Sequence, residues 1–192
     1  MRPIVFKFRG AILAVPALVL IIFGKPTALS AAIGIPLALA GEVLRCWAVG
    51  YSGVTTRSDH LEVPALVTAG PYAHVRNPLY VGNFITALGF AIAFTGALPQ
   101  AQALLLIVAA LIFVVLVYAI IVPYEEGFLR DKFGVTFEQY CTRVPRVIPQ
   151  CAAAPGYGTF RAEVIRDAET RTFVTFAVML GALALKAAFS YP

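Results

Sequence analysis

Two adjacent carboxylates are the residues of this chain that are best placed to do chemistry. Glu125 and Glu126 follow directly on a long apolar run. Neighbouring carboxylates repel each other, and acidic residues close to membrane depth are candidates for function. A carboxylate can accept hydrogen bonds or take up a proton. The pair therefore predicts a site for a polar ligand, although Glu126 and Arg130 are also spaced as an ordinary surface ion pair.

A second polar segment covers residues 70–83 and offers an anion-binding helix start. Asn77 followed by Pro78 is typical of a helix that begins there, with Asn at the N-cap and Pro at the first helical position. The amides of that first turn and the helix dipole favour an anion or another polar ligand. The structural alternative is a capped membrane helix with Tyr72 and Tyr80 in the interfacial aromatic belt.

Other residues allow narrower expectations. His74 could move a proton, although such a histidine more often simply lies at the membrane interface. Glu42 and Arg45, three apart near the end of an apolar run, favour a structural ion pair. The proline-framed segment 143–149 would form a lid over the site or contact anionic headgroups. Neither cysteines nor histidines have the spacing of a metal site, so none is predicted.

The composition explains why these polar residues stand out. The chain is 60% hydrophobic and only 13% charged, whereas soluble domains are about 45–50% apolar and about 25% charged. These values exclude a soluble globular domain, a disordered chain and a disulfide-rich secreted module. The chain has a net charge of +5 but no run of basic residues of the kind that nucleic-acid-binding proteins carry. We therefore predict an all-α, polytopic membrane helix bundle.

Five apolar segments approach the roughly 20 residues that cross a bilayer. The first has an alternative interpretation as a signal peptide, because basic residues precede it and residues 28–31 resemble a cleavage site. The first two segments would form a tight hairpin, as would the third and fourth. The predicted spans are 10–24, 30–50, 79–98, 101–122 and 172–191.

The basic residues predict how these spans face. If the N-terminus is inside, all of the 15 Lys and Arg residues except Lys25 and Lys186 fall on the cytoplasmic side. That bias predicts an N-terminus inside and a C-terminus outside. The polar stretches 51–78 and 124–171 flank one hairpin and emerge on the same face, followed by short cytosolic helices after the fourth span. The sequence therefore predicts a site at the cytosolic mouth of the bundle, in an inner (cytoplasmic) membrane.

Three ordered motifs carry a resemblance to a known family. They read GPYxxVRNPxYxG at 70–82, EExxL at 125–129 followed by FG at 133–134, and YxxxVPRxIP at 140–149. Together they resemble the isoprenylcysteine carboxyl methyltransferase and phospholipid methyltransferase superfamily of integral membrane enzymes. The resemblance covers residues 41–149 within a single membrane domain, 1–192. Residues 150–192 form a linker and an additional C-terminal span.

The resemblance implies S-adenosylmethionine (SAM) as methyl donor and a lipophilic acceptor, prenylcysteine carboxylate-like or phospholipid-like, that arrives from the membrane lipids. Arg146 would orient an anionic acceptor, and Glu126 or His74 would take a proton from a neutral one. The residues that would hold the donor are Gly70, Tyr72, Val75, Arg76, Asn77, Pro78, Tyr80, Glu125 and Glu126.

Two departures from the family pattern matter. Asn77 replaces a histidine that many members carry, so a role that needs an imidazole is lost, whereas hydrogen bonding and capping are kept. The additional span has no counterpart in the motif set and would add a wall, shape the acceptor portal or mediate dimerisation. A membrane reductase of the sterol-reductase type that uses NADPH and a non-catalytic membrane scaffold remain as alternatives, and a homo-oligomer stays open.

Overall fold

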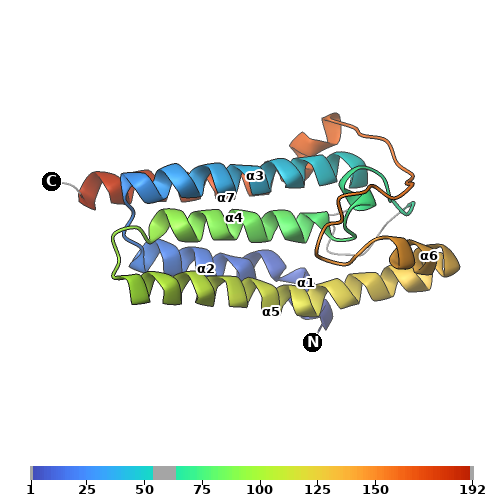
Figure 1. Ribbon diagram of the computed structural model, residues 1–192, viewed down its shortest axis with the longest axis horizontal. Coiled ribbons are helices and arrows are strands. Elements are labelled where there is room, and N and C mark those ends of the chain that lie inside the picture. Colours follow the sequence, from blue (N-terminus) through green and yellow to red (C-terminus); the bar gives the residue numbers. More distant parts are fainter. Residues whose placement is uncertain (1, 54–63, 191–192) are drawn as a thin grey trace.

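The computed structural model describes residues 2–53 and 64–190, and every regular element in them is helical. This confirms the all-α prediction. Long helices run side by side, and the polar connections gather at one end of the bundle (Figure 1). The elements are α1 (Arg2–Lys7), α2 (Arg9–Phe23), α3 (Ala28–Ser52), the 3-10 turn η2 (Gly70–Ala73), α4 (Pro78–Phe94), α5 (Gln100–Phe133), α6 (Val135–Arg143) and α7 (Glu163–Ser190).

Among the described residues, three helices are long and apolar enough to cross a membrane: α3, α5 and α7. Two shorter apolar helices, α2 and α4, have 15 and 17 residues. At 1.5 Å per residue the 34 residues of α5 extend about 51 Å, which exceeds the roughly 30 Å of hydrocarbon. Helix α5 is therefore longer than a crossing of the hydrocarbon layer needs.

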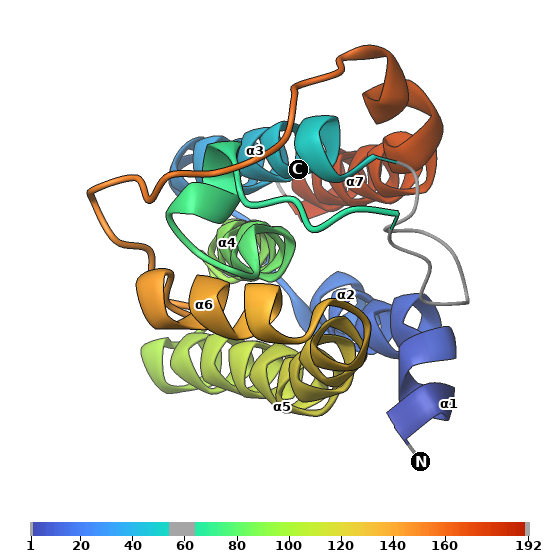
Figure 2. The same cartoon turned by 90° about the vertical axis from the view of Figure 1, so that its right-hand side faces the viewer.

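Helix α4 lies in the middle of the bundle and contacts α2, α3, α5 and α7, as the end-on view shows (Figure 2). Its closest partner is α3, because glycines line the contact. A Cβ atom placed on Gly34 would lie 2.3 Å from the carbonyl oxygen of Gly89, and one on Gly89 would lie 2.4 Å from the backbone nitrogen of Ala38. Gly41 and Gly82 meet in the same way. Small residues of this kind let two membrane helices approach closely.

The polar end of α5 turns sharply into α6. Gly134, with a φ of +49°, ends α5 where the sequence predicts, because this conformation costs a glycine little. Helix α6 then packs the buried side chains of Phe137 and Tyr140 against the end of α5 and the following segment.

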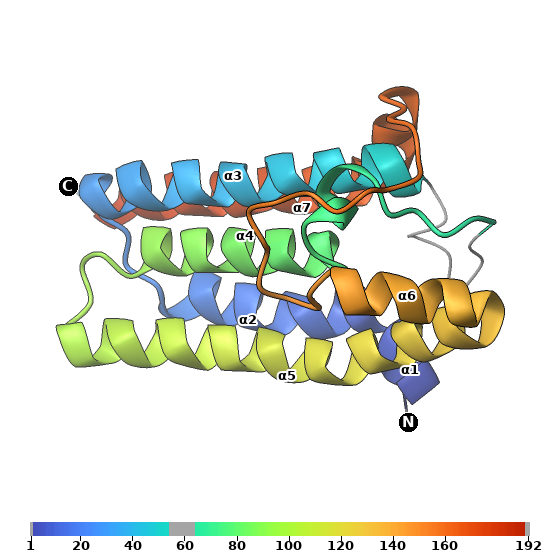
Figure 3. The same cartoon turned by 45° about the vertical axis from the view of Figure 1, so that its right-hand side comes forward.

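Residues 144–161, which we call the strap, cross the polar end of the bundle and lead into α7 (Figure 3). The strap runs antiparallel to residues 68–76 and is bound to them by backbone hydrogen bonds. Arg76 N donates to the Pro145 carbonyl at 2.8 Å, and Gln150 N donates to the His74 carbonyl at 3.0 Å. The predicted lid segment is thus bound to the motif-bearing turn itself.

The C-terminal helix starts earlier than the sequence suggests. The predicted linker 150–171 contains the first turns of α7, which begins at Glu163. The first turns of α7 contain polar residues, whereas the predicted start at residue 172 relied on a continuous apolar run. This correction brings Glu169 into the bundle, where its side chain is fully buried.

Candidate functional site

A cavity of about 810 Å³ lies between the helices and connects the polar end of the bundle with its apolar interior. Glu125, Tyr80 and Tyr72 line its polar end. Its deeper walls carry apolar side chains, including Phe90 and Val114. The volume lies within the range of small-molecule sites, about 300–1,000 Å³.

The carboxylate of Glu126 is the centre of a dense polar cluster. Arg146 donates to Glu126 Oε2 through Nε at 3.0 Å and Nη2 at 2.7 Å, and Arg76 Nε donates to Oε1 at 3.1 Å. The Glu126 side chain is 3% exposed, whereas that of Arg146 is 50% exposed. Glu126 therefore pairs with two arginines that are distant in sequence, and not with Arg130, the neighbour that the helical spacing suggests.

Arg76 and Asn77 join this cluster to the strap. Arg76 Nη1 donates to the carbonyls of Val144 and Cys141, at 2.8 and 3.1 Å. Asn77 occupies the predicted N-cap position of α4, but its side chain makes no capping bond. Its amide donates instead to Glu126 Oε1 at 3.2 Å and to the Arg146 carbonyl at 3.0 Å. The expected capping role is therefore wrong, because the two N–H groups face the carboxylate and the strap.

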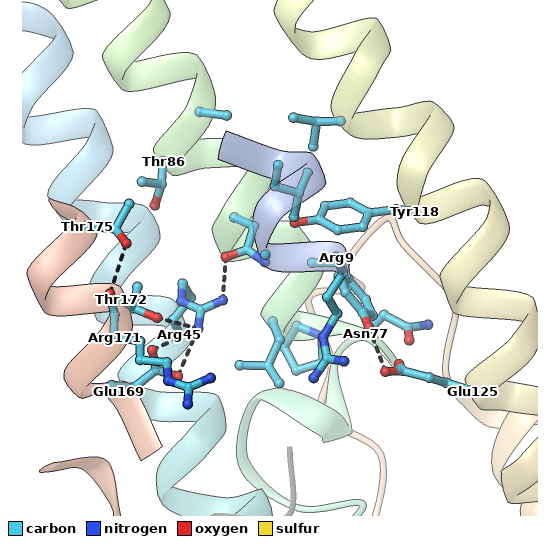
Figure 4. Close-up of a pocket in the computed structure, with 18 of the residues that line it drawn as sticks. Arg9, Arg45, Asn77, Thr86, Tyr118, Glu125, Glu169, Arg171, Thr172 and Thr175 are labelled. Atoms are coloured by element: carbon cyan, nitrogen blue, oxygen red, sulfur yellow. Dashed lines mark hydrogen bonds and ion pairs between the residues drawn. The ribbon is translucent and has the colours of Figure 1, made fainter. Parts of the chain in front are cut away.

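Glu125 has a different environment, although it is the next residue. Its carboxylate faces the cavity (Figure 4). Tyr80 OH donates to Oε1 at 2.7 Å. Among the described residues, Tyr80 is the hydrogen-bond partner of the Glu125 side chain. Its second carboxylate oxygen is therefore available on the side of the cavity.

A second polar cluster lies across the cavity, between α3 and α7. Arg45 Nη2 donates to both carboxylate oxygens of Glu169 at 2.8 Å and to Thr172 Oγ1 at 3.3 Å (Figure 4). Arg45 also binds the side-chain carbonyl of Asn83 through Nη1, and its Nε lies 3.7 Å from Glu42 Oε2. The ion pair expected between Glu42 and Arg45 is thus present, with Glu169 as an additional partner.

Arg9, at the start of α2, points into the cavity between the Arg45 cluster and Glu125 (Figure 4). Its Nη1 donates to the Phe6 carbonyl at 2.8 Å, and its guanidinium lies 4.1 Å from the centre of the Phe6 ring. Arg9 and Glu125 therefore share one compartment, and a zwitterionic ligand would meet both.

Two tyrosines of the polar end remain neutral. Tyr140 OH donates to the Tyr72 carbonyl at 2.7 Å, which ties α6 to η2. Burial raises the pKa of Tyr72 to about 12 and that of Tyr140 well above its ordinary value. At physiological pH both hydroxyl groups are therefore able to donate a hydrogen bond.

The remaining predicted site residues lie around this polar end without lining the cavity in the described structure, apart from Pro78. His74 Nδ1 lies 3.0 Å from the Gln150 carbonyl, and its ring is 6.4 Å from that of Trp47. Gly70 has a φ of +61° and lies against Tyr51, and Val75 is buried. These residues shape the turn that carries Arg76.

Sequence reasoning missed several charged residues that line the cavity, namely Lys7, Arg9, Glu169 and Arg171. The sequence places Glu169 in the predicted linker and indicates for Arg9 only a role in membrane topology. A signal for Glu169 exists, since it lies one helical turn before Thr172 and the apolar residues that follow. Arg9 offers no comparable pattern, because only the packing of α1 and α2 brings it to the cavity.

Fold and site together define a class of protein. An all-helical bundle with spans of membrane length encloses a cavity that is polar at one end and apolar inside. Such a cavity suits a polar ligand and a lipophilic one that meet inside a membrane protein.

The chain belongs to the phospholipid methyltransferase family, whose sequence model matches residues 29–136. It is 30% identical over 132 residues to the cobalt-zinc-cadmium resistance protein CzcN of Cupriavidus metallidurans, which covers 69% of this chain and 53% of that protein. It is 29% identical to protein-S-isoprenylcysteine O-methyltransferase B of Arabidopsis thaliana, over 60% of this chain and 57% of that protein.

A shorter stretch has a higher identity. Protein-S-isoprenylcysteine O-methyltransferase of Schizosaccharomyces pombe is 40% identical over 94 residues, which is 47% of this chain and 34% of that protein. This chain therefore spans about half the length, or less, of these relatives. No solved structure gives a significant match to it.

Proposed function

We propose that this protein is an integral membrane methyltransferase that moves a methyl group from SAM to a lipophilic acceptor, with a prenylcysteine carboxylate as the favoured class. The observation that carries the proposal is the position of Glu125 and Tyr80, on the wall of a cavity that is polar at its mouth and apolar inside. Family membership supports methyl transfer over the NADPH-dependent reductase. The names of two relatives support the acceptor class.

The proposed topology has five spans, α2, α3, α4, α5 and α7, with the N-terminus inside and the C-terminus outside. It is supported by the distribution of Lys and Arg along the sequence. The mouth of the cavity then faces the cytosol, which contains SAM. The membrane would be the inner (cytoplasmic) membrane, with residues 41–149 as the methyltransferase core and 150–192 as an appended region.

The two glutamates would have different roles in donor binding. Glu125 would accept hydrogen bonds from the donor's ammonium or ribose hydroxyl groups, with Tyr80 holding the carboxylate in place. Glu126 would act as a positioning residue, because its two oxygens already accept hydrogen bonds from Arg76, Asn77 and Arg146. Gly70, Val75 and Pro78 would fix the backbone from which Tyr72 and Arg76 project.

SAM, when bound, supplies a methyl group that its sulfonium has already activated. The acceptor oxygen would form a bond to the methyl carbon while the bond from carbon to sulfur breaks, and S-adenosylhomocysteine (SAH) would leave. The chain's residues need only align the two partners and exclude water, which the apolar interior of the cavity favours. A carboxylate acceptor releases no proton in this reaction, so the chemistry does not require His74.

Arg146 remains the proposed contact for the anionic end of the acceptor. Its guanidinium is half exposed and does not line the cavity itself, but one edge is bound to Glu126, which does. Arg9 is a second cation that an acceptor carboxylate would meet inside the cavity. Either arginine would lower the energy of a carboxylate held close to the donor.

The proposal is tested first at the donor. We expect the detergent-solubilised protein to bind SAH in a calorimetric titration and to give no heat with NADPH. The same titration with Glu125→Gln should show weakened SAH binding. Binding of NADPH without binding of SAH would overturn the methyltransferase and favour the reductase.

The acceptor is tested separately. We expect incubation with methyl-labelled SAM and N-acetyl-S-farnesylcysteine to give a base-labile methyl ester, identified by mass spectrometry. Phosphatidylethanolamine in the same assay would give a stable N-methyl product if the acceptor were a phospholipid. Labelling of the phospholipid alone would replace the prenylcysteine proposal with the phospholipid one.

A further inference from the structure

Helix α7 lies outside the part of the chain that the family model matches, residues 29–136, yet it forms a wall of the cavity. The residues concerned are spaced as one face of a helix, and they pass from polar to apolar away from the mouth. From the mouth inward, the main ones are Glu169, Thr172, Thr175, Phe176 and Met179.

Contacts at both ends of α7 fix its position along the bundle and its rotation about its own axis. Near the mouth, the buried ion pair between Arg45 and Glu169 joins α7 to α3, with both side chains less than a tenth exposed. At the far end, Lys186 Nζ donates to the carbonyls of Gly24 and Ile22, at 2.9 and 3.2 Å. A buried ion pair is costly to form and more costly to break on one side. Helix α7 therefore cannot slide along the bundle without losing one of these contacts.

The inner end of the wall closes the cavity. The Phe176 and Phe90 rings meet edge to face, with centroids 4.9 Å apart. Phe176 and Met179 belong to the same buried cluster as Leu183, which lies one turn further along α7 and does not line the cavity. A hydrocarbon chain that enters from the mouth would thus end against Phe176 and Met179.

We infer that α7 is the wall that selects the acceptor, with Phe176 and Met179 setting the length of the prenyl chain that the cavity accepts. This inference rests on the proposed function. The donor groups, Glu125 and Tyr80, lie on α5 and α4. The side chains that meet the acceptor's tail lie on a helix outside the matched family region, so acceptor choice can change without loss of donor binding.

The inference is tested with N-acetylcysteines that carry S-prenyl chains of 10, 15 and 20 carbons. Shortening the side chain in Met179→Ala lengthens the cavity. We expect the ratio of kcat/KM for the 20-carbon to the 10-carbon acceptor to rise roughly tenfold, the scale of one to two methylenes in an apolar pocket. Phe176→Leu should raise the ratio in the same direction. The matched control is Leu185→Ala on the same helix, because this side chain is 61% exposed.

A second measurement needs no turnover. The wild-type protein is photolabelled with an N-acetylcysteine whose 15-carbon S-prenyl chain ends in a diazirine, and the labelled peptides are mapped. We expect labelling within residues 173–183 that excess unlabelled acceptor prevents. Labelling confined to helices other than α7 would overturn the inference.

Failure of this inference is distinguishable from failure of the proposed function. Loss of SAH binding in the wild-type protein would contradict the methyltransferase itself. If SAH binds and prenylcysteines are methylated, but Met179→Ala and Phe176→Leu behave like Leu185→Ala, the donor site stands and α7 does not select the acceptor.

Discussion

Glu125 and Glu126 are neighbours on one helix and both line the cavity, yet their carboxylates have different partners. The carboxylate of Glu126 lies between the start of α4 and the strap, and Arg76, Arg146 and the amide of Asn77 donate to it. The carboxylate of Glu125 faces the cavity and accepts a hydrogen bond from Tyr80. Successive residues of an α-helix point about 100° apart, which is sufficient to place the two in separate environments.

This difference indicates what a paired-glutamate motif can do at the end of a membrane helix. One member joins three segments that are distant in sequence: the end of α5, the start of α4 and the strap. The other member is left to meet a ligand in a cavity whose shape the first maintains. We expect substitutions at the two positions to separate folding from binding.

The largest effect is expected for Glu126→Gln. The amide removes the charge that compensates Arg76, whose side chain is 12% exposed. Breaking one side of a buried pair should lower the free energy of unfolding by about 3 kcal/mol. Denaturant unfolding in detergent measures this free energy. Glu138→Gln is the control, because Glu138 is exposed. Equal stability of the two variants would show that Glu126 does not hold the strap.

The next effect is expected for Glu125→Gln, and it concerns binding. We expect SAH affinity to fall roughly 30-fold, which corresponds to a lost charged hydrogen bond of about 2 kcal/mol. The free energy of unfolding should change little, because a glutamine oxygen can still accept from Tyr80. Calorimetry measures the SAH affinity, and denaturant unfolding of the same preparation measures the free energy of unfolding. A destabilisation as large as that of Glu126→Gln would contradict the contrast between the two carboxylates.

A smaller effect is expected for Tyr80→Phe. The change removes the donor that orients the Glu125 carboxylate but leaves its charge. We expect SAH affinity to fall roughly fivefold, about 1 kcal/mol. Tyr124→Phe is the matched control, because Tyr124 precedes the pair on α5 and packs on Phe6. If the control weakens binding equally, the effect does not come from the hydrogen bond to Glu125.

The smallest effect concerns pH. Burial raises the pKa of Tyr72 to about 12 from an unfolded value of about 10. The protonated form is therefore favoured by folding, and this stabilisation is complete below pH 10 and is lost as the pH rises toward 12. The absorbance of wild-type protein minus that of Tyr72→Phe, measured near 295 nm, should show no phenolate from Tyr72 below about pH 11. A transition at pH 10 would show that Tyr72 is accessible to water.

The helices were largely predictable because hydropathy and local signals determine them. Gly134 ended α5 as predicted, and Asn77 with Pro78 located the start of α4. The family motifs also pointed to residues that the structure brings together: Arg76, Asn77 and Arg146 all bind Glu126.

The partners within the site were not predictable to the same degree. Helical spacing suggested Arg130 for Glu126, whereas the partners come from distant segments that only the strap brings into place. Glu169 was not predicted to be buried, because the first turns of α7 are polar. Hydropathy cannot show that Arg45 on α3 compensates the charge of Glu169. Local patterns describe a helix, but they do not determine which charge from elsewhere in the chain will meet it.

The glycine contact between α3 and α4 also limits how a lipid could enter. A Cβ atom on Gly34 or Gly89 would lie within 2.4 Å of the opposite backbone, so these two helices already touch and cannot move closer. Turning one against the other would drive larger neighbouring side chains into that backbone. The close packing of α3 on α4 therefore leaves no passage for a hydrocarbon tail at this contact, and the pair forms a rigid frame to which α2, α5 and α7 add the other walls of the cavity.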